Sequence, residues 1–275
     1  MSSVARVRKR AGAPPSEQQT PQVEEAFERG VAEGAHRLDR SLMSLVATGI
    51  VGALDLGLGV FAMLIVRNAT GNKLLAAIAF CIGFIALTLA GSELFTENFL
   101  IPITAVITIR RHGPLSLVRL WVGTLVANVI AGFGFMYVVL TAYPGLKHVA
   151  REAGRTYPAM GIGRAALCSA LLAGMAMTLM TWMERSTTSM TAKLVAASVI
   201  AFLLIAAPLD HVIVGSLEMS GALIAGAPFG YGRAFATLGW ATLWNAVGGI
   251  GLVTVLRLVQ VGKEKIEDVR RREAS

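Results

Sequence analysis

The stretch GSELFTEN, residues 91–98, interrupts a long apolar region of the chain. One apolar run, residues 74–90, precedes it, and a second, residues 99–109, follows it. The stretch itself carries Glu93 and Glu97, and carboxylates are costly to bury in hydrocarbon. Irregular backbone at membrane depth is tolerated only where it is buried in protein or lines a cavity. If the two runs lie in a membrane, GSELFTEN is therefore expected to form part of a pore or binding site.

The composition of the 275-residue chain is that of a membrane protein. Hydrophobic residues make up 55% of it and charged residues only 15%, with a mean hydropathy of +0.63; soluble domains have about 25% charged residues. The charges gather in residues 1–40 and 258–275, which predicts one transmembrane domain, residues 41–257, between two polar tails. The net charge of +8 then reflects attraction to anionic membrane lipid, and nucleic-acid binding is not expected.

The N-terminal tail divides into two parts. Residues 1–22 are basic and rich in Pro, Ser and Gln, lack the apolar core of a cleavable signal, and are expected to be disordered in the cytoplasm. Residues 23–41 repeat apolar side chains at helical spacing. We expect an amphipathic helix there, lying on the membrane surface or against the protein's own cytoplasmic face.

Six segments are long and apolar enough to span a membrane, counting those with an internal polar break. The side that carries both termini has most of the 25 lysines and arginines, so both termini are expected in the cytoplasm. The predicted spans are residues 41–66, 74–109, 115–143, 165–183, 194–225 and 234–256.

The six spans form two similar halves. The second span is broken at GSELFTEN and the third carries Asn128, whereas the fifth is broken at APLDH, residues 207–211, and the sixth carries Asn245. Each half has three spans, an odd number, so the second half enters the membrane from the opposite side. An inverted 3+3 repeat with broken helices places a binding or permeation site at the midplane, between the breaks. The expected fold is an all-α bundle of six transmembrane helices with broken second and fifth helices.

At these motifs the chain resembles the formate/nitrite transporter family. The likeness rests on GSELFT at 91–96, ANVIAG at 127–132, PLDH ending at His211 and WNAVGG at 244–249, and the order of spans agrees over roughly residues 23–260. The resemblance implies an aquaporin-like bundle, a homopentamer in which every protomer has its own pore, and conduction of small monovalent anions such as formate or nitrite. The chain looks closest to a less-studied branch with a long charged N-terminal tail, and the resemblance implies the bacterial inner membrane as its location.

The resemblance also assigns the central polar residues. Thr96 and His211 match the family's central pair, and Asn245 matches an asparagine that can hydrogen-bond that histidine. An ionisable group at mid-membrane depth is a functional candidate by itself, because it is costly to keep there. For Thr96 alone, bonding to freed backbone carbonyls is an equally good explanation. Glu93 is expected to support the loop by accepting backbone N–H bonds.

Apolar residues are expected to narrow the path on both sides of this pair. By the same resemblance, Phe95 narrows the cytoplasmic half and Phe80 the outer half, with Phe84 one helical turn after Phe80. The family often has an aromatic residue seven positions before the histidine, where this chain has Leu204. The inner gate is therefore expected to be looser.

Three carboxylates are not expected in a simple anion channel. They are Asp55 midway along the first span, Glu97 after the motif, and Glu218, seven residues after His211. Seven residues are two helical turns, so Glu218 is expected on the same face as His211, about 10 Å farther out. Carboxylates in the path of an anion repel it and hold a nearby histidine protonated. Either these side chains face away from the pore, or the cargo is not an ordinary anion.

The sequence favours transport over catalysis. The other three histidines lie far apart in tails and loops, and the sequence carries no catalytic triad, metal cluster or phosphate loop, so neither an enzyme nor a cofactor is expected. A neutral weak acid crosses an apolar constriction more easily than its anion. We therefore hypothesise that His211 supplies or shares a proton with a small weak-acid anion during passage. The alternatives are a neutral-solute channel, a proton-linked transporter of another small substrate, and a non-conducting protein whose tails recruit partners.

Overall fold

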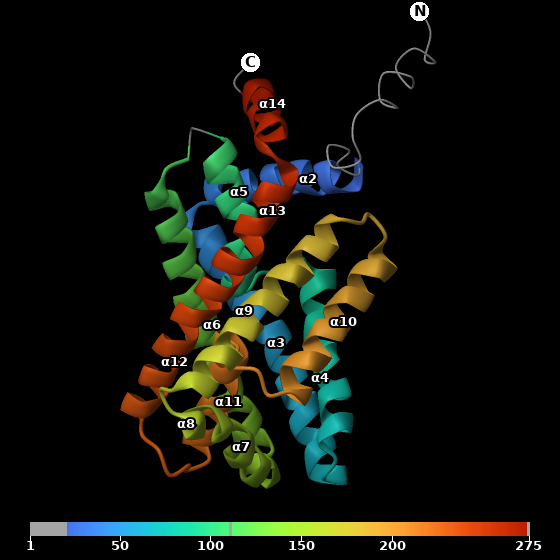
Figure 1. Cartoon of the computed structure of the whole chain (residues 1–275). Helices are drawn as coiled ribbons and strands as arrows, with labels where there is room; N and C mark the ends of the chain where they lie inside the picture. Colours follow the sequence, from blue (N-terminus) through green and yellow to red (C-terminus); the bar gives the residue numbers. More distant parts are fainter. Residues whose placement is uncertain (1–20, 110–111, 274–275) are drawn as a thin grey trace, which may run out of the picture.

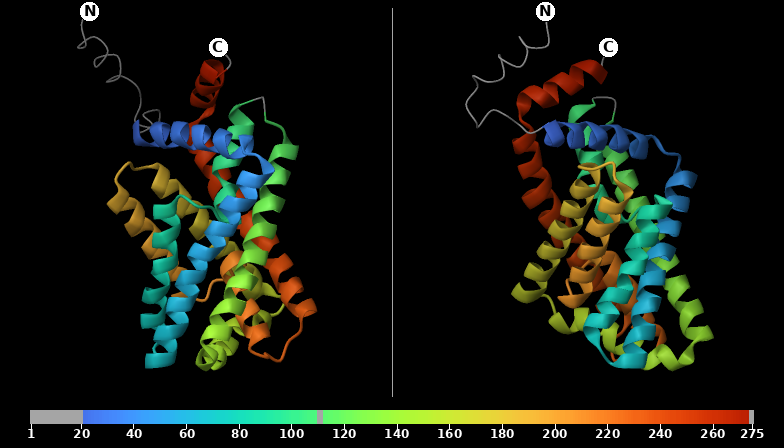
Figure 2. Two further views of the ribbon diagram at one scale, coloured as in Figure 1. Left: turned by 180° about the vertical axis from the view of Figure 1, so that it is seen from behind. Right: turned by 90° about the vertical axis from the view of Figure 1, so that its right-hand side faces the viewer.

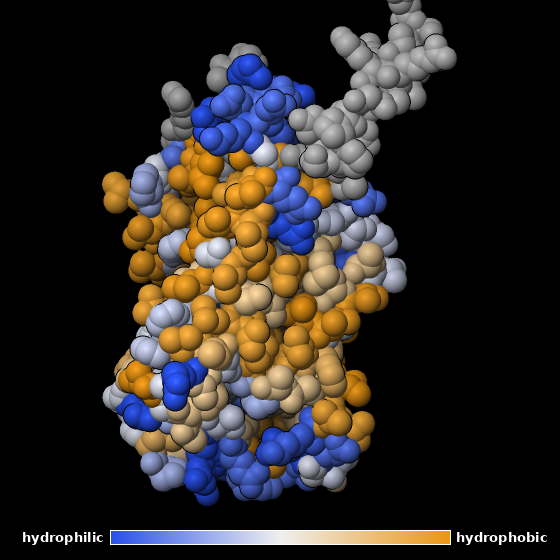
Figure 3. All heavy atoms as spheres, in the orientation of Figure 1, coloured by the Kyte–Doolittle hydropathy of each residue, from blue (hydrophilic) through white to orange (hydrophobic). Residues whose placement is uncertain are grey.

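The computed structural model of the protein describes residues 21–109 and 112–273, and this part of the chain is helical without strands. Long helices run the length of the molecule, and the first and last described helices, α2 and α14, lie at the same end (Figure 1). In the space-filling view an apolar belt separates hydrophilic surfaces at the two ends (Figure 3). Among the described residues, five helices are long and apolar enough to cross a membrane. The protein is therefore a multi-pass membrane-spanning bundle. The basic residues 1–20 and Arg110 and Arg111, which bear on orientation, lie outside the described residues.

The first half of the chain contains three spans, the second of which is interrupted. Ser41 caps the first helix by accepting a hydrogen bond from the Ser44 N–H, and Asn72 caps the next in the same way. The second of these helices ends at Gly91, whose positive φ of 63° favours glycine. The elements are α3 (Leu42–Thr70), α4 (Lys73–Ala90), a 3₁₀ turn η1 (Phe95–Phe99), α5 (Ile101–Thr108) and α6 (Pro114–Ala142).

The second half follows after a short connection. It contains two shorter apolar helices, and residues 207–211 between them are not helical. The elements are η2 (Pro144–Leu146), α7 (Lys147–Gly154), α8 (Thr156–Met160), α9 (Arg164–Arg185), α10 (Met190–Ala206), α11 (Val212–Ile224), α12 (Tyr231–Ala246), the π-helical η3 (Val247–Thr254) and α13 (Val255–Val261). The last three form one apolar stretch, Tyr231–Val261.

Two terminal helices cover one end of the bundle. The amphipathic helix α2 (Pro21–Asp39) lies crosswise over the long helices, with α14 (Lys263–Glu273) beside it (Figure 2). Phe27 and Val31 of α2 are buried against the protein. The Lys265 ammonium of α14 contacts the Glu24 and Glu28 carboxylates of α2 at 3.0 and 2.6 Å. Of the two locations expected for the amphipathic helix, the structure therefore shows the one against the protein's own face.

Small residues allow the backbones around the two breaks to touch. A Cβ atom added at Gly52 of α3 would overlap the backbone carbonyl of Glu93, and one added at Gly174 of α9 would overlap that of Asn245. Membrane helices lack a hydrophobic force between them, so close backbone approach at small residues is a main source of their packing energy.

This packing leads to a prediction about Gly174. Replacing it with alanine forces the α9 and α12 backbones apart, so the Gly174→Ala variant is expected to lose roughly 1–3 kcal/mol of unfolding free energy. The matched control is Gly239→Ala on α12, where an added Cβ meets nothing within 4 Å. Thermal unfolding in detergent compares the two variants. Equal unfolding temperatures would contradict the close approach.

Candidate functional site

The two interrupted spans meet at a hydrogen bond between Thr96 and His211. Their side chains are fully buried, and Thr96 Oγ1 lies 2.8 Å from His211 Nε2. The other ring nitrogen, Nδ1, accepts a hydrogen bond of 3.2 Å from the Val214 N–H and so caps α11. A backbone N–H can only donate, so Nδ1 carries no proton, and in the neutral ring the proton resides on Nε2. The imidazole therefore donates from Nε2 to the Thr96 hydroxyl oxygen.

Asn128 of α6 forms hydrogen bonds with the backbone of the first break. Its Oδ1 accepts a 2.9 Å hydrogen bond from the Phe95 N–H, 33 residues away, and its Nδ2 donates to the Glu93 carbonyl, 35 residues away. Nδ2 also donates to the Gly49 carbonyl of α3 at 2.7 Å. One side chain thus satisfies backbone groups that the interrupted helix leaves without partners.

Asn245 of α12 forms the same set of bonds at the second break. Its Oδ1 accepts from the Val212 N–H, 33 residues away, and its Nδ2 donates to the Asp210 carbonyl, 35 residues away, and to Ala170 of α9. The expectation that Asn245 bonds the His211 ring is wrong in this structure, because both ring nitrogens already have other partners. Asn245 instead forms hydrogen bonds with the backbone on both sides of His211, at Asp210 and Val212.

The four apolar residues expected to narrow a path are all buried. Phe80, Phe84, Phe95 and Leu204 are all buried members of one hydrophobic cluster. The Phe80 and Phe84 ring centroids are 5.8 Å apart, and Phe95 packs edge-on against Phe99 at 5.0 Å. These positions fit constrictions on a path through the pair. That the four residues narrow such a path stays a prediction.

Glu93 and Glu97 face arginines of α2. The Glu93 carboxylate lies 3.0 Å from Arg37 Nε and 2.5 Å from Arg40, and the Glu97 carboxylate lies 3.7 Å from Arg37. Glu93 therefore supports the loop through guanidinium groups, and the expectation of backbone N–H partners is wrong. Burial alone would lower the pKa of the 3%-exposed Arg37, but Glu93, Glu97 and Glu33 together raise it, so Arg37 stays charged.

Sequence reasoning missed both arginines. Arg37 also donates to the Asn98 side chain at 3.1 Å, so α2 is bonded directly to the break. The signal was present, because two acids inside an apolar region need cations, and the neighbouring helix 23–41 supplies them. A polar cavity of about 360 Å³ lies here among α2, α4, α9 and α10, and its lining includes Arg37, Glu97 and Glu184.

Asp55 and Glu218, the other two carboxylates not expected in a simple anion channel, form no ion pair with Arg37 or Arg40. Asp55 of α3 accepts a 2.5 Å hydrogen bond from the Ser92 hydroxyl and so contacts the first break. Glu218 is buried on α11, close to the Tyr157 hydroxyl of α8. Sequence reasoning missed Tyr157 and also Ser169 of α9, whose hydroxyl accepts a 2.9 Å bond from the Asp210 N–H.

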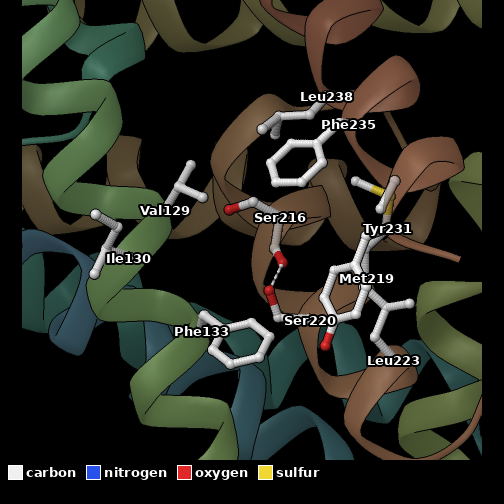
Figure 4. A pocket seen from close by; sticks show the side chains of 11 residues that line it. Val129, Ile130, Phe133, Ser216, Met219, Ser220, Leu223, Tyr231, Phe235 and Leu238 are labelled. Atoms are coloured by element: carbon white, nitrogen blue, oxygen red, sulfur yellow. Dashed lines mark hydrogen bonds between the residues drawn. The ribbon is translucent and has the colours of Figure 1, made fainter.

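A second cavity, of about 290 Å³, lies between α6, α11 and α12, away from the pair (Figure 4). Its lining is apolar except for Ser216, Ser220 and Tyr231. The Ser220 hydroxyl donates to the Ser216 carbonyl at 2.6 Å, so it is already engaged. With no charged side chain in its lining, this cavity does not fit a small anion.

The sequence matches the family described as formate/nitrite transporter over residues 24–259. The chain belongs to the formate/nitrite transporter family. This match confirms the family that the sequence resembles. Members of this family are channels and transporters and not enzymes. One relative is the inner membrane protein YfdC of Escherichia coli strain K12, which is 25% identical over 202 residues. The match covers 68% of this chain and 62% of YfdC, so the chain spans less than two thirds of that relative's length.

Two solved structures of the family share the fold. The chain is similar to an FNT family ion channel with a TM-score of 0.71 and 18% identity, over 84% of this chain and 96% of that one. It is also similar to a pentameric formate channel with formate bound, with a TM-score of 0.62 and 19% identity, over 81% of this chain and 98% of the other. At these identities the likeness establishes the helical channel fold.

Removing the buried arginine is predicted to destabilise the protein. Arg37→Gln removes the cation that Glu97 faces and leaves Glu93 with Arg40 alone, and breaking a buried ion pair on one side costs roughly 3–5 kcal/mol. We expect a lower unfolding temperature in detergent and faster proteolysis of α2. Arg164→Gln is the control because Arg164 is exposed at the start of α9. Equal behaviour of the two variants would show that the ion pairs do not hold α2.

Proposed function

We propose that the protein is a channel or transporter for small monovalent weak-acid anions of the formate or nitrite class, with Thr96 and His211 as its central site. Membership of the family supports transport. The observation that carries the proposal is the buried 2.8 Å hydrogen bond where the two interrupted spans meet. An ionisable ring that is fully buried fits a solute that crosses in or near its neutral form.

The membrane arrangement proposed for this site is an inverted 3+3 repeat. Asn128 and Asn245 bond backbone groups at the same two separations, 33 and 35 residues, in the two halves of the chain. This equivalence supports two related halves with a site between their breaks.

The name of YfdC supports an inner membrane location in a bacterium, and the lysine and arginine bias of the sequence supports cytoplasmic termini. The pentameric neighbour supports a homopentamer whose apolar belt contacts lipid.

His211 assists the anion by sharing its Nε2 proton. An arriving anion replaces Thr96 as the acceptor of this N–H, and the Thr96 hydroxyl, whose own proton is not used in the bond to His211, donates a second hydrogen bond to the anion. Complete transfer of the Nε2 proton would leave an imidazolate unless Nδ1 gained a proton at the same time. Protonated Nδ1 no longer accepts from Val214, so the α11 cap would be lost. Sharing of the proton within a hydrogen bond is therefore the easier step for this ring.

The proposal predicts selection for weak acids over the anions of strong acids. In proteoliposomes formate, nitrite and acetate are expected to move faster as the pH is lowered, because each can take up a proton. Chloride cannot, and we expect its flux to be far lower at every pH. Osmotic swelling with uncharged solutes tests the neutral-solute alternative. Chloride flux equal to that of formate would contradict weak-acid transport.

The ring and its partner can be tested without disturbing the helix. His211→Asn retains a residue that caps helices well but removes the Nε2 donor, so protein yield is expected to persist while the pH dependence of formate flux is lost. Thr96→Val removes one hydrogen bond, worth about 1–1.5 kcal/mol or roughly a tenfold change in rate. Thr96→Ser retains the hydroxyl and serves as the control. An unaltered pH profile in His211→Asn would refute proton sharing.

A further inference from the structure

Three ionisable side chains are buried together on the side of the second break that faces away from α2 and α14. Asp210 lies in the break itself, Tyr157 on α8 and Glu218 on α11. Their exposed fractions are 1%, 1% and 6%. The labels for α8 and α11 lie in the lower part of Figure 1, opposite the end that carries α2 and α14. None of the three takes part in the Thr96–His211 hydrogen bond.

Tyr157 lies near both carboxyl groups. Its hydroxyl is close to Glu218, and Asp210 is near enough to act on it electrostatically. Its ring lies beside Gly215, where an added Cβ would be 3.7 Å from the ring and 3.8 Å from Asp210 Oδ1. Asp210 and Tyr157 therefore both pack beside Gly215 of α11. Both oxygens of the Asp210 carboxyl group are buried without a hydrogen-bond partner among the described residues.

No cation offsets these carboxyl groups by direct contact. Within residues 21–109 and 112–273, neither Asp210 nor Glu218 forms an ion pair. Arg67 of α3 acts on Glu218 only from a distance, because its guanidinium pairs with Glu152 at 3.4 Å. The remaining groups near α11 bond elsewhere: Arg151 to the Ala225 carbonyl, Arg233 to the Pro158 carbonyl, and His211 to Val214 and Thr96.

A carboxylate buried without a cation is costly enough that the group takes up a proton instead. The three side chains do not fit a metal, since no group of three or more His, Cys, Asp or Glu that could hold one occurs among the described residues. We propose that Asp210, Tyr157 and Glu218 form a proton-binding site, separate from the Thr96–His211 pair, that holds at least one carboxyl group in its acid form.

This site supplies the proton that His211 cannot release without losing its helix cap. A carboxylic acid of the site donates its proton to the arriving anion, which forms the neutral acid and leaves a carboxylate. A proton from the adjacent aqueous side restores the acid. The coupling step rests on the proposed anion transport, whereas the protonation of the site does not. If both hold, one proton accompanies each anion and the protein acts as a proton-linked transporter.

Infrared spectroscopy of the purified full-length protein tests the site without transport. We expect wild-type protein at neutral pH to show the carbonyl stretch of a protonated carboxylic acid, and Asp210→Asn or Glu218→Gln to reduce it. Tyr157→Phe is expected to shift this band because it removes the hydroxyl close to Glu218, and it remains informative if an acid variant fails to fold. Glu152→Gln is the control, because the Glu152 side chain is 61% exposed. No such band in wild type, or a band unaffected by both acid variants, would overturn the proposal.

Proteoliposomes with a pH-sensitive dye test the coupling. Wild-type protein is expected to take up protons together with formate, and the Asp210→Asn/Glu218→Gln double variant to lose this proton uptake while Glu152→Gln retains it. Identical proton uptake per formate in wild type and the double variant would overturn the coupling. If wild type moves no formate, the proposed function fails, and the infrared result still decides whether the site holds a proton.

Discussion

The structure depends on satisfying the backbone polar groups that two interrupted helices expose within an apolar bundle. Water is not available there, so each freed N–H and C=O needs a partner inside the protein. Asn128 and Asn245 meet this requirement with single side chains, each of which accepts one backbone N–H and donates to two carbonyls. Because the breaks are fixed in this way, Thr96 of the 3₁₀ turn η1 and His211 at the N-cap of α11 can be held opposite each other.

The acidic side chains at the two breaks have different partners. At the first break, Arg37 and Arg40 pair with Glu93 and Arg37 also faces Glu97, and these contacts attach α2 to the bundle. At the second break, neither Asp210 nor Glu218 forms an ion pair among the described residues. A fixed positive charge retains a carboxylate as an anion, whereas an apolar or neutral environment favours the acid. The first arrangement therefore suits a structural role and the second suits movement of a proton.

Helix capping restricts the chemistry of His211. The ring occupies the N-cap of α11, so its Nδ1 lone pair is committed to Val214 and its only proton faces Thr96. A histidine with one free nitrogen can accept a proton and release another, as a shuttle does. Here Nδ1 caps the helix, and only Nε2 remains to bond the proposed substrate. The helix that positions the ring thus also limits how far the ring can act as an acid.

The sequence by itself determined the all-helical membrane fold, both breaks and the amphipathic helix, because apolar runs, polar interruptions and helical spacing are local patterns. It also placed Thr96 and His211 at one site, although that pairing came from the family resemblance and not from the residues alone. Only the tertiary structure decided which groups these residues touch. Arg37 meets Glu93 across 56 positions of chain, and Thr96 meets His211 across 115. Such contacts depend on how helices pack and rotate against one another, and no local pattern carries that information.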